Sequence, residues 1–347
     1  MNVPVSVIFA GLPKAISVPK PRTPCRCYQV GSWCSRWSAT PGNESSTSLA
    51  SALSTHSNPK FSYKKGEKIG SGAFGTVYQG LCEQTGSLVA IKETTVALGD
   101  KNIPKLIQEI QLMAQLSHPN IVLYLGAKHD EELGVLRIYQ EWVPGGSVDA
   151  LLRKYGRLSE VIVKRYASHT LEALDYLHRN NIIHRDVKLE NMLMQSDGHV
   201  VVADMGFAKT KVEFCEEKLR TFCGTVECVA PELLRGQPYG FMVDWWAFGI
   251  LLFQMVVGKT PFHHENPRQM CSWILKSPPP TNEKRTSKAL LATVTQLLRK
   301  EAKTRLGYGK AGAADVMASP LFHGLSFSKM AIKGSEPPFK PKVVDLS

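Results

Sequence analysis

The feature that most restricts the fold of this chain is a glycine-rich stretch, GEKIGSGAFGTVYQG, in which Gly70, Gly72 and Gly75 have the spacing G-x-G-x-x-G. Two unrelated nucleotide-binding folds use this spacing. A dinucleotide-binding βαβ unit needs a helix after the glycines, and Glu93 could serve as its acidic residue. The residues after Gly75 are instead β-branched and aromatic, and SLVAIK predicts a further strand that ends at Lys92. The pattern therefore predicts a hairpin whose glycines let backbone amides approach phosphate oxygens.

A helix is predicted over residues 102–116, NIPKLIQEIQLMAQL. Its apolar face consists of Ile107, Ile110, Met113, Ala114 and Leu116. Glu109 lies close to this face, where an acidic residue is ordinarily a solvated one. If the helix packs beside the strand that ends at Lys92, Glu109 instead pairs with Lys92 and directs its ammonium towards the α- and β-phosphates of a nucleotide.

The stretch LRIYQEWVPGGS predicts a strand that ends before Pro144. Such a break suits a hinge between two lobes, where backbone groups of Glu141 and Val143 bond an adenine and Gln140 closes the back of the pocket. An ordinary strand end is the alternative.

The following stretch, EVIVKRYASHTLEALDYLHRNN, predicts a core helix with one apolar face. That face contains Val163, Tyr166, Ala167, Thr170, Leu171, Leu174 and Leu177.

The stretch IIHRDVKLENMLM carries the strongest signal for chemistry. Asp186, Lys188 and Asn191 are close enough in sequence for one loop to turn all three side chains to a single point. Phosphoryl transfer needs an acceptor for the hydroxyl proton, a cation for the γ-phosphoryl oxygens and a ligand for magnesium. Asp204 follows an apolar strand-like run, and its carboxylate adds a second oxygen ligand of the kind that Mg²⁺ prefers. His184 is interpreted as a packed structural residue.

Over residues 61–324 the chain resembles a eukaryotic protein kinase. The matching motifs are GSGAFGTV, VAIK, HRDVKLEN, Asp-Met-Gly at 204–206, APE at 230–232, VDWWAFG, and Arg305 as the partner of Glu232. The resemblance implies an α+β fold with a small β-rich lobe over a larger helical lobe, and ATP and Mg²⁺ in the cleft. The lysine of HRDVKLEN is typical of serine/threonine kinases.

Carried onto this sequence, the resemblance makes Lys92, Glu109, Asp186 and Lys188 catalytic and gives Asn191 and Asp204 to the metal. The nucleotide contacts it implies are Ile69, Gly70, Ser71, Gly72, Ala73, Phe74, Gly75, Val77, Ala90, Lys92, Gln140, Glu141 and Val143. Thr221 lies between Asp204 and APE, where an activation loop belongs, so it is the predicted phosphosite. Arg185 would grip its phosphate.

The subfamily signal is mixed. HPNIVLYLGA and EWVPGGSV resemble MAP-kinase-kinase-kinases, whereas TFCGTVECVAPELL and PPFKPKV resemble AGC-type kinases, which the chain matches more closely because the tail at 325–347 also fits. Val226 and Cys228 replace a usual proline and aromatic, so the floor of the peptide site is expected to differ. Ser147 and Gln254 stand where arginine-selecting relatives place acids. Protein substrates and an upstream activating kinase are the expected partners of a monomeric catalytic domain.

Residues 1–60 differ in composition from the rest, with fifteen Ser or Thr, six Lys or Arg and a single acid, Glu44. Such a segment buries too little apolar surface to order itself. It is predicted to be a disordered arm of a cytoplasmic protein, with an organelle transit segment as the alternative. The eight cysteines have no paired C-x-x-C spacing, which fits reduced thiols.

The sequence admits three function classes. The net charge of +12 admits a module that binds nucleic acid or a membrane surface, but no segment is densely basic, and we expect no nucleic-acid partner. The most apolar run, 245–253, is too short to span a membrane. A pseudokinase scaffold is the second class, because Met205 replaces the phenylalanine usual in Asp-Phe-Gly. The chain keeps Lys92, Asp186 and Asp204, so an active serine/threonine kinase is the preferred interpretation.

Overall fold

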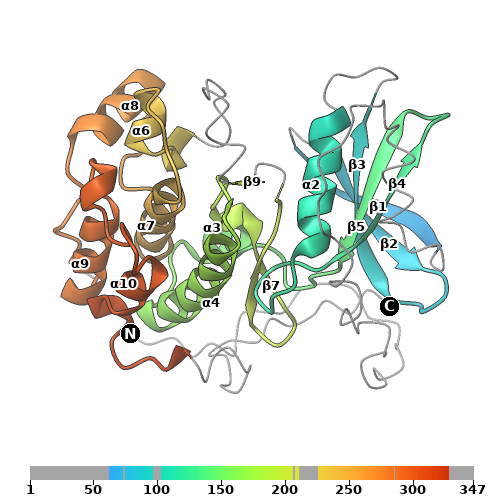
Figure 1. Cartoon of the computed structure of the whole chain (residues 1–347). Coiled ribbons are helices and arrows are strands. Elements are labelled where there is room, and N and C mark those ends of the chain that lie inside the picture. Colours follow the sequence, from blue (N-terminus) through green and yellow to red (C-terminus); the bar gives the residue numbers. More distant parts are fainter. Residues whose placement is uncertain are drawn as a thin grey trace.

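The computed structural model describes residues 62–72, 75–96, 103–205, 208–210, 226–284 and 286–327. Figure 1 shows two lobes side by side, one built on a β-sheet and the other on helices. This is the two-lobed α+β architecture that the sequence predicts. The arm at 1–60, most of the tail at 325–347, Ala73, Phe74, Gly206 and Thr221 lie outside the described residues, so the predicted domain limits stay predictions.

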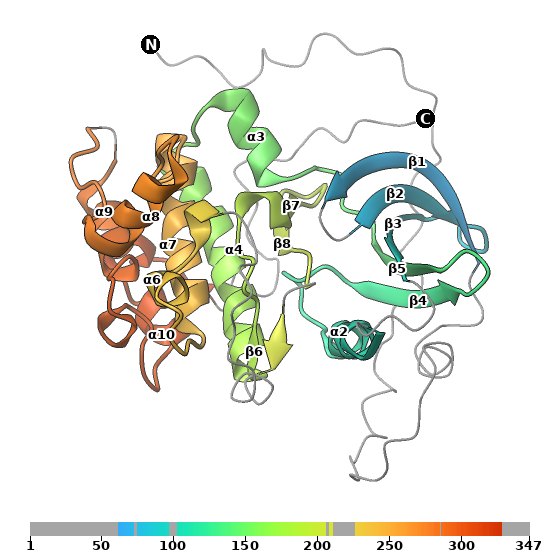
Figure 2. The ribbon, with the colours of Figure 1, turned by 90° about the horizontal axis from the view of Figure 1, so that it is seen from above.

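The small lobe is an antiparallel sheet of five strands in the order β1-β2-β3-β5-β4. Its strands are β1 (Tyr63–Gly72), β2 (Gly75–Cys82), β3 (Leu88–Thr95), β4 (Tyr124–Asp130) and β5 (Val135–Glu141). Alternation along β3 turns Val89 and Ile91 into a small core with Tyr139, and turns Ala90 and Lys92 to the opposite face. The helix α2 (Ile103–Gln115) packs beside β4, as Figure 2 shows from above.

The large lobe is built around two long helices, α4 (Glu160–Arg179) and α7 (Met242–Val257). The whole predicted apolar face of α4 is buried, from Val163 to Leu177. The apolar run at 245–253 is the interior of α7, which packs between α4 and α9. Among the described residues, no helix has the length and apolarity needed to cross a membrane.

Shorter elements complete this lobe. The α-helices are α3 (Val148–Tyr155), α6 (Pro231–Leu234), α8 (Pro267–Lys276), α9 (Lys288–Leu297) and α10 (Ala313–Met317). The 3-10 helices are η3 (Leu189–Asn191), η4 (Val226–Cys228), η5 (Ala302–Thr304) and η6 (Pro320–Phe322).

Two small antiparallel pairs of strands lie where the lobes meet. Strand β6 (Ile182–Ile183) pairs with β9 (Lys209–Thr210), and β7 (Met192–Met194) pairs with β8 (Val200–Val202). The backbone of Val202 bonds on both sides of the segment before β4, accepting from Val122 N at 2.9 Å and donating to Asn120 O at 2.8 Å. The β7–β8 hairpin is therefore fixed to the lobe junction, and the candidate site lies at its open end.

Candidate active site

The glycine-rich hairpin forms as predicted, with Gly70 opposite Val77, Ser71 opposite Thr76 and Gly72 opposite Gly75. Gly75 has a φ of +120°, and a Cβ there would overlap the carbonyl oxygen of Glu93 on β3. Position 75 therefore needs a glycine, because strand β3 leaves no room there for a side chain. Gly70 has open space where its Cβ would be, so that position leaves room for a ligand.

Strand register gathers several predicted nucleotide contacts on one face of the sheet. Val77 lies opposite Lys92, and Ala90 lies opposite Gln140. Directly opposed residues of antiparallel strands point to the same face, so these four side chains share it. Ile69 is exposed, as a residue that covers a ligand must be before the ligand binds.

The hinge segment is held by both the backbone and the side chain of Glu141. Its N–H donates to Leu123 O at 3.0 Å, and its Oε1 accepts from Leu123 N at 3.0 Å. Its Oε2 accepts from Gln195 Nε2 at 3.3 Å. Since the N–H is already used, the carbonyl is the backbone group of Glu141 that an adenine can bond. Val143 is buried in a cluster with Val122 and Val201.

Lys92 forms an ion pair across the lobes, with its Nζ 2.8 Å from Asp204 Oδ1. Sequence reasoning assigned both residues to the site but did not predict this contact. The predicted pairing of Lys92 with Glu109 stays a prediction. Glu109 does lie on α2, half-buried and one residue before the core residue Ile110. The ion pair joins the lysine of the small lobe to the aspartate of the large lobe. Lys92 lies on the face of the sheet that it shares with Val77, Ala90 and Gln140.

The loop after β6 brings Asp186, Lys188 and Asn191 together as predicted. Lys188 Nζ lies 2.7 Å from Asp186 Oδ2, and Asn191 Nδ2 donates to Asp186 O and Oδ2, both at 2.9 Å. Burial alone would lower the pKa of the Lys188 ammonium. The hydrogen bond to Asp186 and the charges of Asp186, Glu190 and Asp204 outweigh burial and raise that pKa. Lys188 therefore stays a cation beside the carboxylate.

Asp244, near the start of α7, fixes the backbone of this loop. Its carboxylate is fully buried and accepts from His184 N at 2.9 Å, from Arg185 N at 2.8 Å, and bonds His178 Nε2 at 2.8 Å. Burial would raise the pKa of Asp244, but the hydrogen bond and charge of His178, the charge of His184 and the Arg185 amide lower it on balance. An ionised anchor thus holds Arg185 at a φ of +70°, a conformation unusual for a side chain of this size.

The β7–β8 pairing brings the two predicted metal ligands together. Met192 pairs with Val202, and Ala203 N donates to Asn191 O at 2.8 Å, so Asn191 and Asp204 flank the same hairpin end. The Nδ2 of Asn191 donates to Asp186, so Oδ1 is the side-chain atom of Asn191 that can bind a metal ion. No cluster of three or more His, Cys, Asp or Glu suited to a metal occurs in the described part of the chain. Two oxygen ligands are what Mg²⁺ takes when phosphates and water complete its shell.

Met205 is buried in the main core, whereas its neighbour Asp204 bonds Lys92 at the site. That core also contains Met113, with Tyr124 packed against it, and His184 is fully buried nearby, with its Nε2 3.3 Å from Ala203 O. The prediction that His184 is a packed structural residue agrees with this burial. Met205 therefore fills an apolar position, and Asp204 adopts a φ of +61°, a conformation unusual for a residue other than glycine.

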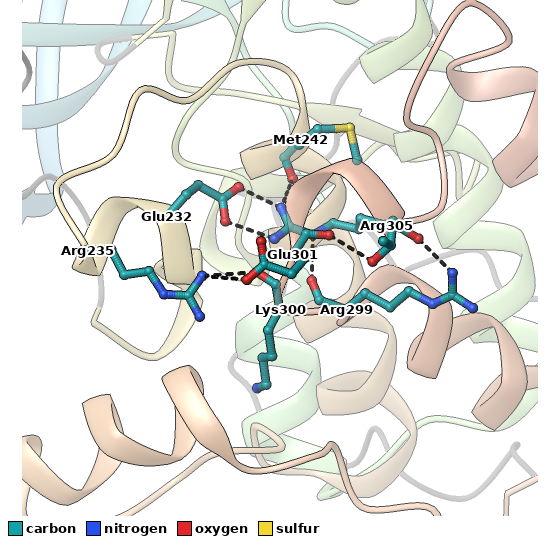
Figure 3. A network of polar contacts seen from close by, with 8 residues as sticks. Glu232, Arg235, Met242, Arg299, Lys300, Glu301 and Arg305 are labelled. Atoms are coloured by element: carbon teal, nitrogen blue, oxygen red, sulfur yellow. Dashed lines mark hydrogen bonds and ion pairs between the residues drawn. The ribbon is translucent and has the colours of Figure 1, made fainter.

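The predicted pair between Glu232 and Arg305 is confirmed and fully buried (Figure 3). Two parallel bonds of 2.7 and 2.8 Å join the guanidinium to the carboxylate. The same guanidinium donates to Met242 O at 2.6 Å and to Arg299 O at 3.0 Å. This network ties α6 to the first residue of α7 and to the segment around η5.

Two features were missed by sequence reasoning. The first is the anchoring role of Asp244, although a lone acid at the start of an otherwise apolar helix signals a buried acceptor. Arg185 lies 5.7 Å from the ring centroid of Tyr239, a contact between residues far apart in sequence. Thr221, the phosphate partner predicted for Arg185, lies outside the described residues.

A sheet lobe over a helical lobe, with a lysine, two aspartates and an asparagine converging between them, defines the class of two-lobed phosphotransferases. The protein kinase domain model matches residues 63–322, and the chain belongs to that family. The catalytic subunit of cAMP-dependent protein kinase from Schizosaccharomyces pombe is 33% identical over 279 residues, which cover 80% of this chain and 53% of that protein.

Relatives of a second kind match as well. Mitogen-activated protein kinase kinase kinase ANP1 of Arabidopsis thaliana is 37% identical over 215 residues, 60% of this chain and 32% of that relative. The cAMP-dependent protein kinase type 3 of Saccharomyces cerevisiae is 32% identical over 282 residues, 79% of this chain and 68% of the relative. The mixed resemblance predicted from the sequence is thus confirmed. The chain spans about half the length of the first of these relatives and about a third of the second.

Proposed function

We propose that this chain is an ATP-dependent serine/threonine protein kinase that transfers the γ-phosphoryl group of Mg-ATP to hydroxyl groups of protein substrates. One observation carries the proposal: Asp186, Lys188 and Asn191 meet within 2.7–2.9 Å, and the paired Lys92 and Asp204 lie at the adjoining hairpin end. Protein acceptors are supported by the names of the relatives.

The residues divide the work of transfer between them. Asp186 accepts the proton of the substrate hydroxyl while the hydroxyl oxygen forms a bond to the γ-phosphorus of ATP. The bond between that phosphorus and the bridging oxygen of the β-phosphate breaks, and ADP leaves. Lys188, kept cationic by Asp186, neutralises charge on the γ-phosphoryl oxygens. Lys92 exchanges its bond to Asp204 for the nucleotide phosphates.

Asn191 Oδ1 and the Asp204 carboxylate would hold magnesium, which when bound neutralises charge on the β- and γ-phosphates. Lys92 occupies Asp204 Oδ1 at 2.8 Å, so binding requires the lysine to move from this carboxylate to the phosphates. Asn191 stays in place through its two bonds to Asp186. The donor set is all oxygen and fits a hard cation.

The proposal is tested by incubating the purified full chain with γ-labelled ATP, magnesium and a randomised peptide library that contains serine, threonine or tyrosine. We expect label on serine and threonine peptides. Asp186→Asn keeps the size of the side chain and its contacts with Asn191 but removes the proton acceptor, so label should fall by at least about a hundredfold. Equal label from both proteins would refute the role of Asp186, and label on tyrosine alone would refute the substrate class.

A further inference from the structure

Glu227, in η4, has both of its carboxylate oxygens engaged by one loop of the helical lobe. Thr260 Oγ1 donates to Oε2 at 2.8 Å, and His263 Nδ1 lies 2.9 Å from Oε1. The Glu227 side chain is 25% exposed, while Thr260 is buried. Hydrogen bonds to a carboxylate are stronger than those between neutral groups. They therefore join η4 firmly to Thr260, 33 residues further along the chain, and to His263, 36 residues further.

The loop that supplies Thr260 and His263 is itself firmly seated. Gly258 ends α7 with a φ of +93°, and a Cβ there would overlap the carbonyl oxygen of Gly156. Phe262 is buried and stacks on Trp246 at 5.7 Å between ring centroids. Thr260 and Phe262 are therefore anchored in the core, while the His263 side chain, 53% exposed, reaches Glu227 from the surface.

Helix η4 packs against α7 and α8, and Val226 and Cys228 rest on the main core. Burial, followed by the charges of Glu190, Glu227 and Asp186, raises the pKa of the Cys228 thiol to about 12. The charges that act on this thiol thus include that of Asp186 in the catalytic loop. Val226 and Cys228 bring neither a fixed φ nor a large ring to this segment, so the bonds of Glu227 add a polar restraint to their apolar packing.

We propose that Glu227, Thr260 and His263 form a positioning clamp that holds η4 as the floor beneath the protein substrate, next to Asp186. The inference deepens the proposed function and rests on it. Glu227 acts through the backbone it fixes, and each of its carboxylate oxygens accepts a bond from within the protein. Glu190, another acid whose charge acts on Cys228, is exposed to solvent, whereas Glu227 is 25% exposed and bonded through both oxygens.

The test compares Thr260→Val, which removes the donor and keeps the shape, with Thr260→Ser, which keeps the donor. Thr260→Val should raise by about tenfold the KM for a library peptide that wild type phosphorylates. This is the scale of one lost hydrogen bond to a carboxylate. Thr260→Ser should stay within about twofold of wild type, and the KM for ATP should not change in either. Thr295→Val is the matched control, because Thr295 Oγ1 donates to Leu291 O within α9 at 2.7 Å.

Two peptides separate a clamp from a substrate contact. Glu227→Gln should raise the KM for a peptide rich in arginine and for its neutral counterpart by the same factor. A rise confined to the arginine peptide would overturn the proposal and make Glu227 a substrate ligand. An unchanged KM in Thr260→Val would overturn it as well.

Hydrogen exchange keeps the test independent of the kinase assignment. The amides of residues 226–230 should exchange faster in Thr260→Val than in wild type, Thr260→Ser or Thr295→Val, whether or not the protein transfers phosphate. Wild type without transfer but with this exchange pattern would refute the proposed function and leave the clamp standing. Unchanged exchange in Thr260→Val would refute the clamp even in an active enzyme.

Discussion

At the level of single side chains, Met205 and Asp204 divide structure from chemistry. Met205 is 3% exposed within the main core, whereas Asp204 bonds Lys92 at the site. Exchanges between apolar side chains of similar volume usually cost less than about 1.5 kcal/mol. We therefore expect Met205→Phe to change kcat by only several-fold, through the balance between loop positions, because methionine is the more flexible side chain.

Asp204→Ala is the matched change at the neighbouring position. It removes an oxygen ligand and the partner of Lys92, so kcat should fall by about a hundredfold or more. Steady-state kinetics of both variants, with circular dichroism to verify folding, provide the comparison. A Met205→Phe variant that loses as much activity as Asp204→Ala would show that the middle residue takes part in the chemistry.

Between elements, the firmest link is the attachment of the catalytic loop to α7 through Asp244. Asp244→Ala leaves the N–H groups of His184 and Arg185 and the ring of His178 without their buried acceptor. Unsatisfied buried donors cost about 1–3 kcal/mol each, so the free energy of unfolding should fall by about 3 kcal/mol or more.

Thermal melts of Asp244→Ala and Asp175→Ala provide the measurement and its control. Asp175 pairs with Arg179 one helical turn away, and that arginine is 77% exposed. Surface pairs of this kind contribute about 0.3–0.5 kcal/mol, so Asp175→Ala should melt close to wild type. Equal melting of both variants would show that the Asp244 contacts do not stabilise the loop.

The segment between β9 and η4 contains the predicted phosphosite, Thr221. A phosphate there would carry a charge of about −1.5 to −2, and Arg185 precedes Asp186 directly, so its guanidinium can join the two. Thr221→Ala should lower kcat by at least about tenfold through one lost set of charge-assisted bonds. Mass spectrometry of the active enzyme checks the modification. Full activity of a chain that carries no phosphate would refute the prediction.

Across the whole molecule, the sequence predicted best what repeats along the chain. The apolar period of α4 and the strand pattern from Gly75 to Lys92 both led to the elements observed. Contacts such as Asp186 with Asn191 followed because one short loop holds both residues. The ion pair of Lys92 with Asp204 joins residues 112 apart, and the tie of Glu227 to Thr260 joins two folded segments. Such long-range pairs depend on how elements pack, which local periodicity does not encode.

The helical lobe also carries a buried acid that couples its stability to pH. Burial on α4 raises the pKa of Glu172 from 4.5 to about 7, with Arg165 lowering it and Asp175 raising it further. A carboxyl whose pKa is raised by folding contributes stability that is full below pH 4.5 and lost as pH rises through about 7. Glu172→Gln should therefore stabilise the fold at pH 8, by up to about 3 kcal/mol, and leave it unchanged at pH 4.5.

Denaturant unfolding at pH 4.5 and pH 8 measures this difference. Glu132→Gln, on the exposed turn between β4 and β5, is the control and should give the same stability change at both pH values. A Glu172→Gln variant with no added stability at pH 8 would contradict a raised pKa for Glu172.

The central claim is that a chain with Asp-Met-Gly in this loop keeps a working phosphotransfer site. The most direct test measures Mg-ATP binding and phosphate transfer on one preparation of the full chain whose Thr221 is phosphorylated. We expect wild type to bind Mg-ATP and to phosphorylate serine or threonine peptides. Binding without transfer, together with transfer restored by Met205→Phe, would contradict the claim and identify the protein as a pseudokinase.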